Sequence, residues 1–457
     1  MKKFQTILLI IFGIGAVFAV MVFAGYIPTP ASKGKIKGSG TVIVWGTISD
    51  TNFVSYMSDM ADGIQDFNIR YIVKNPATYE SELIEAFAAS KGPDLFFVNN
   101  ENMLRFSNQI EPISYTTLPQ KTFLDTFASA FSVYLSPKGV IAYPFLIDPM
   151  VLYYNKTLLA NDGIANPPAY WDEINTLAER LTKRDTTGSF MQSTIPMGRF
   201  ENNIHAKDIV ILLLTQVGNN IISFNSEGQY ISTLMSHKTT QGASLPSVVT
   251  YFTDFASPDT LVYSWNKSLP DATSSFSIER IALYPGFASE LFTLQKNNPN
   301  LAFSVSDIPQ PRGIVNKKTY AKVTGIALSR YSTNKLTAIL TMQTIASPYH
   351  AGQIAKTLSL PSAYSADLKA NPDPSLAYQA VLQSAALRAV SFRDPNNIQT
   401  GNIFRQLTQS ILAGGADSEG AYARADADLT FLLNKLNQAA VSSSSSPNTS
   451  ATAPIGR

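Results

Sequence analysis

Short apolar runs alternate with amphipathic stretches along most of the chain. Thr41–Gly46 and Leu95–Val98 are largely apolar runs of strand length. Residues 79–91, 171–184 and 333–349 instead repeat apolar side chains every three or four positions, which predicts helices with one buried face. This alternation predicts an α/β protein with largely parallel sheets.

The stretch from Gly139 to Leu159 departs from this pattern. Two apolar, strand-like pieces are separated by Asp148 and Pro149. Proline cannot donate to a strand ladder, and it biases the residue before it towards extended geometry. A carboxylate is costly inside a sheet unless it is hydrogen-bonded. Continuous sheet pairing is therefore not expected through these two residues.

Polar residues follow several of the apolar runs. In parallel sheets, ligands bind beyond the carboxyl ends of the strands. The loops at these positions are polar with an occasional aromatic residue, which suits a neutral, hydroxyl-rich ligand. The candidate residues are Asp50, Asn52, Asn100, Glu101, Asp148, Gly286 and Phe287. Strand ends also simply meet water, so the pattern alone leaves both interpretations open for each loop.

Length, charge and composition narrow the class of protein. A chain of 457 residues exceeds one ordinary hydrophobic core, which predicts two domains. Lys+Arg 35 against Asp+Glu 33 gives a net charge of +2, so no nucleic-acid partner is expected. The absence of cysteine excludes disulfides, cysteine metal sites, thiol catalysis and a lipid attached through cysteine. No metal site or cofactor is expected, because His205, His237 and His350 lie outside metal-binding patterns and no nucleotide-binding loop occurs.

The N-terminal segment carries a targeting pattern. Two lysines precede a nearly uncharged run from Phe4 to Ile27, which is long enough for a transmembrane anchor. The same residues 1–27 also fit a signal peptide cleaved after Ala24. Both interpretations place the rest of the chain outside the cytoplasm. Residues 28–40 are expected to be a flexible linker, and the Ser-rich residues 441–457 a disordered tail.

Six segments carry a recognisable pattern. In "YPFLIDPMVLYYNK", which starts at Tyr143, an acidic residue and "YNK" follow a Tyr-Pro step. The others are "GPDLFFVNN", "PPAYWDEINTLAERLT", "ERIALYPGFASEL", "VTGIALSRYSTNKLTAILTMQTIASP" and "AGGADSEGAYARADADL". In this order, from Thr41 to about Leu436, they resemble the extracellular solute-binding proteins of ABC importers, the family that includes maltose-binding protein. The chain departs from the family where Tyr170 replaces a helix-capping Thr, and it lacks the lipoprotein cysteine.

The resemblance implies a fold of two α/β lobes, similar to the type II periplasmic binding proteins. Each lobe would be a mostly parallel sheet flanked by helices. The implied boundaries are residues 41–147 plus 312–352 for lobe 1 and residues 148–311 plus 353–440 for lobe 2. The chain would cross between the lobes at Asp148-Pro149 and again at Ser306–Pro311, so that the carboxylate of Asp148 faces the cleft.

The resemblance also implies a function. A polar small molecule, with a sugar or oligosaccharide as the first expectation, would be captured by hinge closure and presented to a membrane permease. The protein would act as a monomer and not as an enzyme. The few tryptophans leave short peptides, polyols and polyamines open as ligands. The alternative function is an exported glycoside hydrolase that uses two carboxylates.

Aromatic side chains are candidates for stacking on such a ligand. These candidates are Trp45, Tyr79, Tyr153, Trp265, Tyr284 and Phe287. Tyr153 alternates with Tyr154, so one of the two is expected to face the core and the other the cleft. Trp171 lies on an apolar helix stripe and is expected in the core. Arg393 resembles a residue of the late loop that closes over the ligand, and a surface ion pair with Asp394 is the other interpretation.

Overall fold

The structure is a computed structural model that describes residues 38–64, 66–235, 245–374, 376, 378–414 and 418–444. The expected anchor or signal peptide and residues 28–37 of the expected linker lie outside these residues, as do residues 445–457 of the expected tail and His237. In the part of the chain that is described, no helix combines the length and apolarity needed to cross a membrane.

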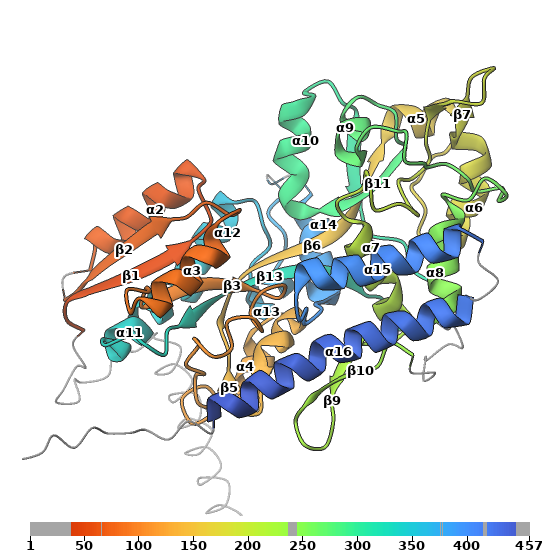
Figure 1. The fold of residues 1–457 in the computed structure, drawn as a ribbon. Coiled ribbons are helices and arrows are strands. Elements are labelled where there is room, and N and C mark those ends of the chain that lie inside the picture. The colour runs from red at the N-terminus through yellow and green to blue at the C-terminus, as the bar shows by residue number, and fades with distance from the viewer. Residues whose placement is uncertain are drawn as a thin grey trace, which may run out of the picture.

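Strands and helices alternate in the N-terminal part of the chain up to β3, whereas later parts contain runs of one kind, such as β4 to β6 and α11 to α14 (Figure 1). The strands are β1 Thr41–Gly46, β2 Asn68–Val73, β3 Leu95–Asn99, β4 Leu135–Ser136, β5 Gly139–Val140, β6 Tyr143–Asn155, β7 Lys183–Arg184, β8 Phe190–Gln192, β9 Ile222–Phe224, β10 Tyr230–Ser232, β11 Leu283–Phe287, β12 Phe303–Ser306, β13 Thr319–Leu328 and β14 Ala389–Val390. The α-helices are α2 Thr51–Asp62, α3 Tyr79–Ala88, α4 Gln120–Thr126, α5 Lys156–Asn161, α6 Trp171–Leu181, α7 Ala206–Gln216, α8 Leu245–Asp254, α9 Ala272–Ser277, α10 Leu291–Asn297, α11 Lys335–Ile345, α12 Pro348–Thr357, α13 Ser365–Lys369, α14 Gln379–Arg388, α15 Asn397–Leu412 and α16 Ser418–Ser444. Two short 3₁₀ helices are η1 Ser129–Tyr134 and η2 Ala288–Glu290.

The main sheet is mixed. Its strand order is β11-β6-β13-β3-β1-β2, with β12 also on β6 and β14 also on β13. β1 is parallel to β2 and β3, whereas β13 is antiparallel to β3 and β6. β11 and β12 are both antiparallel to β6. The α/β class is confirmed, but the expectation of mostly parallel sheets is wrong around β6, because β6 and β13 run in opposite directions past each other.

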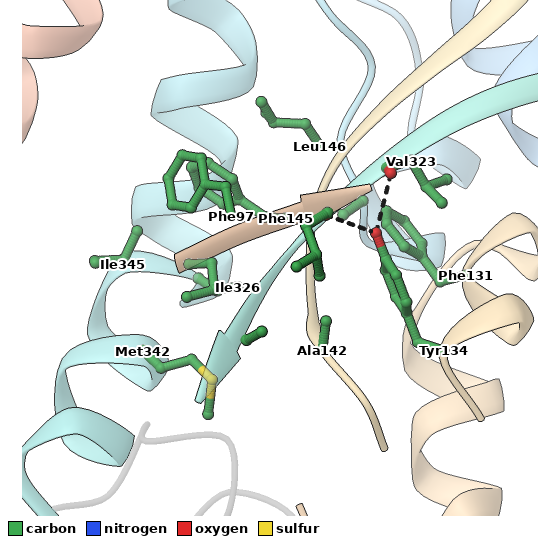
Figure 2. Packing of buried hydrophobic residues seen from close by; sticks show 14 of the residues in the cluster. Phe97, Phe131, Tyr134, Ala142, Phe145, Leu146, Val323, Ile326, Met342 and Ile345 are labelled. Atoms are coloured by element: carbon green, nitrogen blue, oxygen red, sulfur yellow. Dashed lines mark hydrogen bonds between the residues drawn. The ribbon is translucent and has the colours of Figure 1, made fainter. Parts of the chain in front are cut away.

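Buried apolar side chains form separate cores. The first lies around β1, β3, the first half of β6 and α11, and its residues define lobe 1 here. Figure 2 shows its centre, where the Tyr134 hydroxyl donates to the carbonyls of Val98 at 3.2 Å and Val323 at 3.0 Å. The second and third cores lie around the second half of β6, α7, α8, β11 and β12, and they define lobe 2.

β6 passes from one lobe to the other without a break. Ile147 belongs to the first core and Met150 to the second. Asp148 and Pro149 still pair with Lys322 and Ala321 of β13, so the expected interruption of sheet pairing is wrong. Pro149 is tolerated because the pairing passes at this point from β13 to β11 and β12, beginning with Met150 against Phe287. The chain passes from the first core to the second where the crossing was expected, but it does so within one continuous strand. We call this point the handover.

The second crossing lies elsewhere than expected. Gln310, within the expected segment Ser306–Pro311, forms a bridge with Tyr170 and receives an N–H from Lys318, so this segment remains in lobe 2. The chain passes between the cores inside β13, because Tyr320 packs in the second core and Ala321 in the first. The boundary at residue 353 also differs, since Tyr364 and Leu368 pack in the first core.

At the start of α6, the Glu173 side chain takes the place of the missing threonine cap. Its cap residue Tyr170 has no side-chain acceptor for the first helical N–H groups. The Glu173 carboxylate instead folds back and accepts the backbone N–H groups of Ala169 at 2.8 Å and Tyr170 at 3.2 Å. The helix then buries Trp171, whose indole N–H donates to Gln216 at 2.7 Å, and this confirms the expected core position.

Candidate functional site

Charged side chains from both lobes meet where β3, β6, β11 and β13 come together. We call this set the strand-end cluster. It consists of Glu101, Asp148, His205, Lys207, Asp208, Glu290, Lys322 and Asp394. Glu101 follows β3 in lobe 1, whereas Lys207 and Asp208 lie in the first turn of α7 in lobe 2.

Lys207 forms an ion pair between the lobes. Its ammonium lies 3.0 Å from the Glu101 carboxylate and 2.9 Å from that of Asp394, and it also donates to the Asn397 side chain. Asp394 is completely buried. Burial alone would lower the pKa of Lys207, but Asp394 and Glu101 outweigh it and raise the pKa above its ordinary value. The ammonium is therefore charged at neutral pH and neutralises the fully buried carboxylate of Asp394 and the largely buried one of Glu101.

Lys322 adds a second cation beside the first. Its ammonium lies 3.4 Å from Asp208, 3.7 Å from Glu101 and 4.9 Å from the centre of the Phe287 ring. Burial would raise the pKa of Asp208, but Lys322 and the other cations nearby lower it below its usual value. Asp208 is thus ionised, although the side chain is 2% exposed.

His205 is held between two carboxylates. Its Nε2 lies 3.0 Å from Glu290, and its Nδ1 lies 3.7 Å from Asp208. Burial lowers the pKa of this imidazole, but the two carboxylates raise it to about 9, so the ring is charged at neutral pH. Within the described residues, Nδ1 of His205 and Oδ1 of Asp208 are buried without a hydrogen-bond partner. These two atoms offer a donor and an acceptor inside the cluster.

Asp148 is the half-buried carboxylate at the edge of the cluster. It accepts the backbone N–H of Ser289 at 3.0 Å and the Ser289 hydroxyl at 2.6 Å. Burial raises the pKa of Asp148 to about 6, against the lowering effect of these two hydrogen bonds. Because Ser289 is exposed, its hydroxyl is a partner that a ligand hydroxyl can replace.

Glu290 ties the loop after β11 to the cluster. Its carboxylate accepts from the Tyr284 hydroxyl at 2.9 Å and the Phe287 backbone N–H at 2.8 Å, besides facing His205. Gly286 makes this arrangement possible, because a Cβ there would lie 2.5 Å from Glu290 Oε2 and 2.7 Å from the Tyr284 ring.

We expect Gly286→Ala to lower the free energy of unfolding by about 2 kcal/mol, the usual cost of overpacking. The measurement is the melting temperature. Gly352→Ala is the matched control, because a Cβ at that helical position meets no heavy atom of the described residues within 4 Å. An unchanged melting temperature for Gly286→Ala would contradict the tight approach at Glu290.

Several expected site residues lie at or beside this cluster. Glu101 and Asp148 belong to it, and Tyr284, Gly286 and Phe287 pack around Glu290 and Lys322. Asn100, the residue before Glu101, is fully buried. Its side-chain amide donates to the Tyr320 hydroxyl and the Phe392 carbonyl and accepts the Val323 backbone N–H. It positions the strand ends from within the sheet.

The other aromatic candidates are placed in the cores. Trp265 is fully buried and donates its indole N–H to Asn202 at 2.8 Å. Tyr153 is fully buried with its hydroxyl on the Phe287 carbonyl at 2.7 Å, whereas Tyr154 is half-buried. Tyr79 is buried in lobe 1 and donates to the Phe97 carbonyl at 2.8 Å. Because these rings are buried, their exposure does not support contact with a ligand, and such a role remains a prediction.

The remaining candidates serve local structure. Asp50 caps α2 by accepting the Phe53 N–H at 3.0 Å, and Asn52 is exposed in the first turn. Trp45 has the Lys74 ammonium 3.6 Å from its ring centre. Arg393 donates to the Val133 and Leu135 carbonyls at 3.0 Å each, while its neighbour Asp394 pairs with Lys207. Their contact with a ligand remains untested.

The cationic side chains of the strand-end cluster, and Asp208 beside them, were not predicted from the sequence. His205, Lys207 and Asp208 stand directly before and within a helix that is buried along its whole length. Charges at the start of such an apolar helix are a signal for a buried ionic site, and Lys322 inside the apolar strand β13 is a second one. In the described ranges, no group of three or more acidic or histidine side chains could hold a metal ion.

The chain matches a known protein family, and its fold is similar to that of several solved structures. A family model described as "Bacterial extracellular solute-binding protein" matches residues 59–379. The sugar-binding protein MalE from Xanthomonas citri is similar with a TM-score of 0.70 at 15% identity, over 88% of this chain and 99% of its own. An extracellular solute-binding protein from Staphylococcus aureus, solved in complex with maltose, has a TM-score of 0.66 at 16% identity, over 88% of this chain and 100% of its own. At these identities the solved structures show that the fold is shared.

Proposed function

This chain belongs to the bacterial extracellular solute-binding proteins, and from that premise we propose that it captures a sugar or oligosaccharide at the strand-end cluster. The lobes would close around this ligand and present it to the permease of an ABC transporter. The observation that carries the proposal is the meeting of Glu101 from lobe 1 with Lys207 and Asp208 from lobe 2 around Asp148.

The chemistry of the cluster supports a hydroxyl-rich ligand. Carboxylate oxygens of Asp148 and Asp208 accept hydrogen bonds from hydroxyl groups, and the imidazole of His205 donates one. Each charge already has an opposite charge or a donor beside it, so a neutral ligand can exchange individual hydrogen bonds without leaving a charge unpaired. Solved structures of similar fold hold maltotetraose and α-D-tagatose, which supports the sugar class.

Closure follows if a ligand binds both lobes better in one arrangement than in another. β6 and β13 are the strands that join the cores, and Asp148 lies at the handover. A ligand that touches Asp148 and groups of both lobes shifts the population towards the closed arrangement. In this proposal the protein is a monomer held at the cell surface by its N-terminal segment.

We expect sugars to raise the melting temperature of the full-length protein. A ligand present at about 100 times its Kd stabilises the folded state by about 2.7 kcal/mol. The measurement is a thermal-shift screen of mono- and oligosaccharides, with peptides and polyamines in parallel, followed by small-angle scattering with the best ligand. Stabilisation by peptides or amines alone would contradict the sugar assignment, and an unchanged radius of gyration would contradict closure.

A second function deserves the same screen because the site is rich in carboxylates. A glycoside hydrolase needs two carboxylates, one acting as acid and one as base or nucleophile. The pKa of Asp148 at about 6 suits a general acid. Thin-layer chromatography of the sugars after incubation distinguishes the two functions, because a binding protein returns them unchanged.

A further inference from the structure

A second cavity lies away from the strand-end cluster. It has a volume of about 520 Å³ and is lined by residues of α10, α12, α13 and α14 and of the loops between them. None of the eight cluster residues lines it. Its volume is within the range of about 300–1,000 Å³ that small-molecule sites occupy.

This cavity lies at a junction of two cores. Leu291 of α10 and Leu382 of α14 belong to the third core, in lobe 2. The opposite wall is α12, which is anchored in the first core by Ile354, and Leu360 packs against both cores. Figure 1 shows α10 and α12 on different lobes. An occupant would therefore touch both lobes.

The walls combine amide, hydroxyl and apolar groups with the charged side chains of Lys356, Asp367 and Asp373. Gln295 of α10 and Gln379 and Gln383 of α14 provide side-chain amides, and Ser359 provides a hydroxyl. Amides and hydroxyls both donate and accept hydrogen bonds, so together they match a ligand with several hydroxyl groups. Phe292 lies on the rim and is 54% exposed, which offers a ring face for the apolar side of such a ligand.

Two of the five non-glycine residues with positive φ in the described part of the chain lie at or next to this cavity. Ser359 has a φ of 51° and lines it, and Tyr378, with a φ of 63°, directly precedes the lining residue Gln379. Each such conformation costs a non-glycine residue on the order of 1–2 kcal/mol. Strain of this kind persists where the surrounding structure fixes it, and it is frequent at ligand sites.

We propose that this cavity is a second ligand site, which binds a small, neutral, hydroxyl-rich molecule the size of a mono- or disaccharide. The site is separate from the capture of a sugar at the strand-end cluster and does not depend on it. Because its walls come from both lobes, its occupant favours the lobe arrangement in which both walls reach it.

The absence of cysteine allows a direct test by thiol labelling. Gly352 lines the cavity, and an added Cβ there meets no heavy atom of the described residues within 4 Å, so Gly352→Cys places the chain's single thiol in the cavity. Gln353→Cys is the matched control, since Gln353 is exposed on the same helix and does not line the cavity. Both variants are made in the full-length chain, and their melting temperatures confirm folding.

The measured quantity is the rate of labelling by a small maleimide with and without glucose or maltose. We expect a sugar at about four times its Kd to slow labelling of Gly352→Cys about fivefold, while Gln353→Cys is unaffected. The comparison is repeated with Asp148→Asn, which alters the cluster alone, and the protection should persist. Equal rates with and without both sugars overturn the proposal. Protection that disappears with Asp148→Asn also overturns it, because the sugar then acts from the cluster, and the proposed function stands.

Discussion

Replacing Lys207 by methionine is expected to destabilise the protein by about 3 to 5 kcal/mol. Lys207 is 9% exposed and pairs with Asp394, whose side chain is fully buried, and with Glu101, which is 12% exposed. Methionine keeps much of the side-chain volume but leaves both carboxylates without their cation. For a protein of this size, the loss should lower the melting temperature by roughly 5 °C.

Two further variants distinguish the effect of breaking a buried ion pair from the effect of losing any positive charge. Lys121→Met removes an ion pair with Asp125 whose side chains are 87% and 63% exposed, and it should cost less than about 1 kcal/mol. Adding Asp394→Asn to Lys207→Met should recover part of the stability, because the buried negative charge is then gone. Equal melting temperatures for Lys207→Met and Lys121→Met would show that the cluster does not depend on this cation.

Most of the fold could be predicted because local patterns decide it. The apolar runs became β1 and β3, and the amphipathic stretches became α3, α6 and α11. α11 shows where the pattern misleads. Leu336, one of the apolar positions in the pattern of residues 333–349, is 49% exposed, whereas Thr337 is buried with its hydroxyl on the Ser39 carbonyl at 3.2 Å. A polar side chain with a distant partner replaces an apolar one, and periodicity carries no information about that partner.

The crossovers were harder to predict for a related reason. In the sequence, proline indicates a break in sheet pairing, and this places the handover correctly at Asp148-Pro149 but gives its form wrongly. The same sign failed at Ser306–Pro311, because β13 crosses through Tyr320 and Ala321 without any proline. A crossing is defined by which core each side chain enters, and this depends on strand pairs far apart in the chain.

Two of the eight residues of the strand-end cluster could be predicted from the sequence. Glu101 and Asp148 were found because both follow or interrupt apolar strands, where a carboxylate has no local reason to be. Lys207 and Lys322, whose ammonium groups lie beside the Glu101 carboxylate, follow Glu101 by 106 and 221 residues in the chain, and only the fold brings them together. The aromatic candidates failed to gather for the opposite reason, since large rings such as Trp265 are most easily accommodated in a core.

Asp148→Asn tests binding and stability in opposite directions. The carboxylate is where a ligand hydroxyl would make a charge-assisted hydrogen bond, worth about 1.5–3 kcal/mol. Its removal should weaken binding of the sugar found in the screen by about 10- to 100-fold in calorimetric titration. Asp125→Asn, on an exposed turn of α4, is the control and should leave the Kd unchanged.

The stability of the same variant should depend on pH. The pKa of Asp148 is raised from 3.8 to about 6 by burial, so the folded state favours the protonated form. In the wild-type protein this stabilisation is complete below pH 3.8 and is lost as the pH rises through about 6. Asparagine does not ionise, so Asp148→Asn should be more stable than wild type by about 1 to 2 kcal/mol at pH 7.5 and equal to it near pH 4. Normal binding by the variant would show that the Asp148 carboxylate does not contact the ligand. A melting temperature that follows the wild type at every pH would show that this carboxylate does not strain the site.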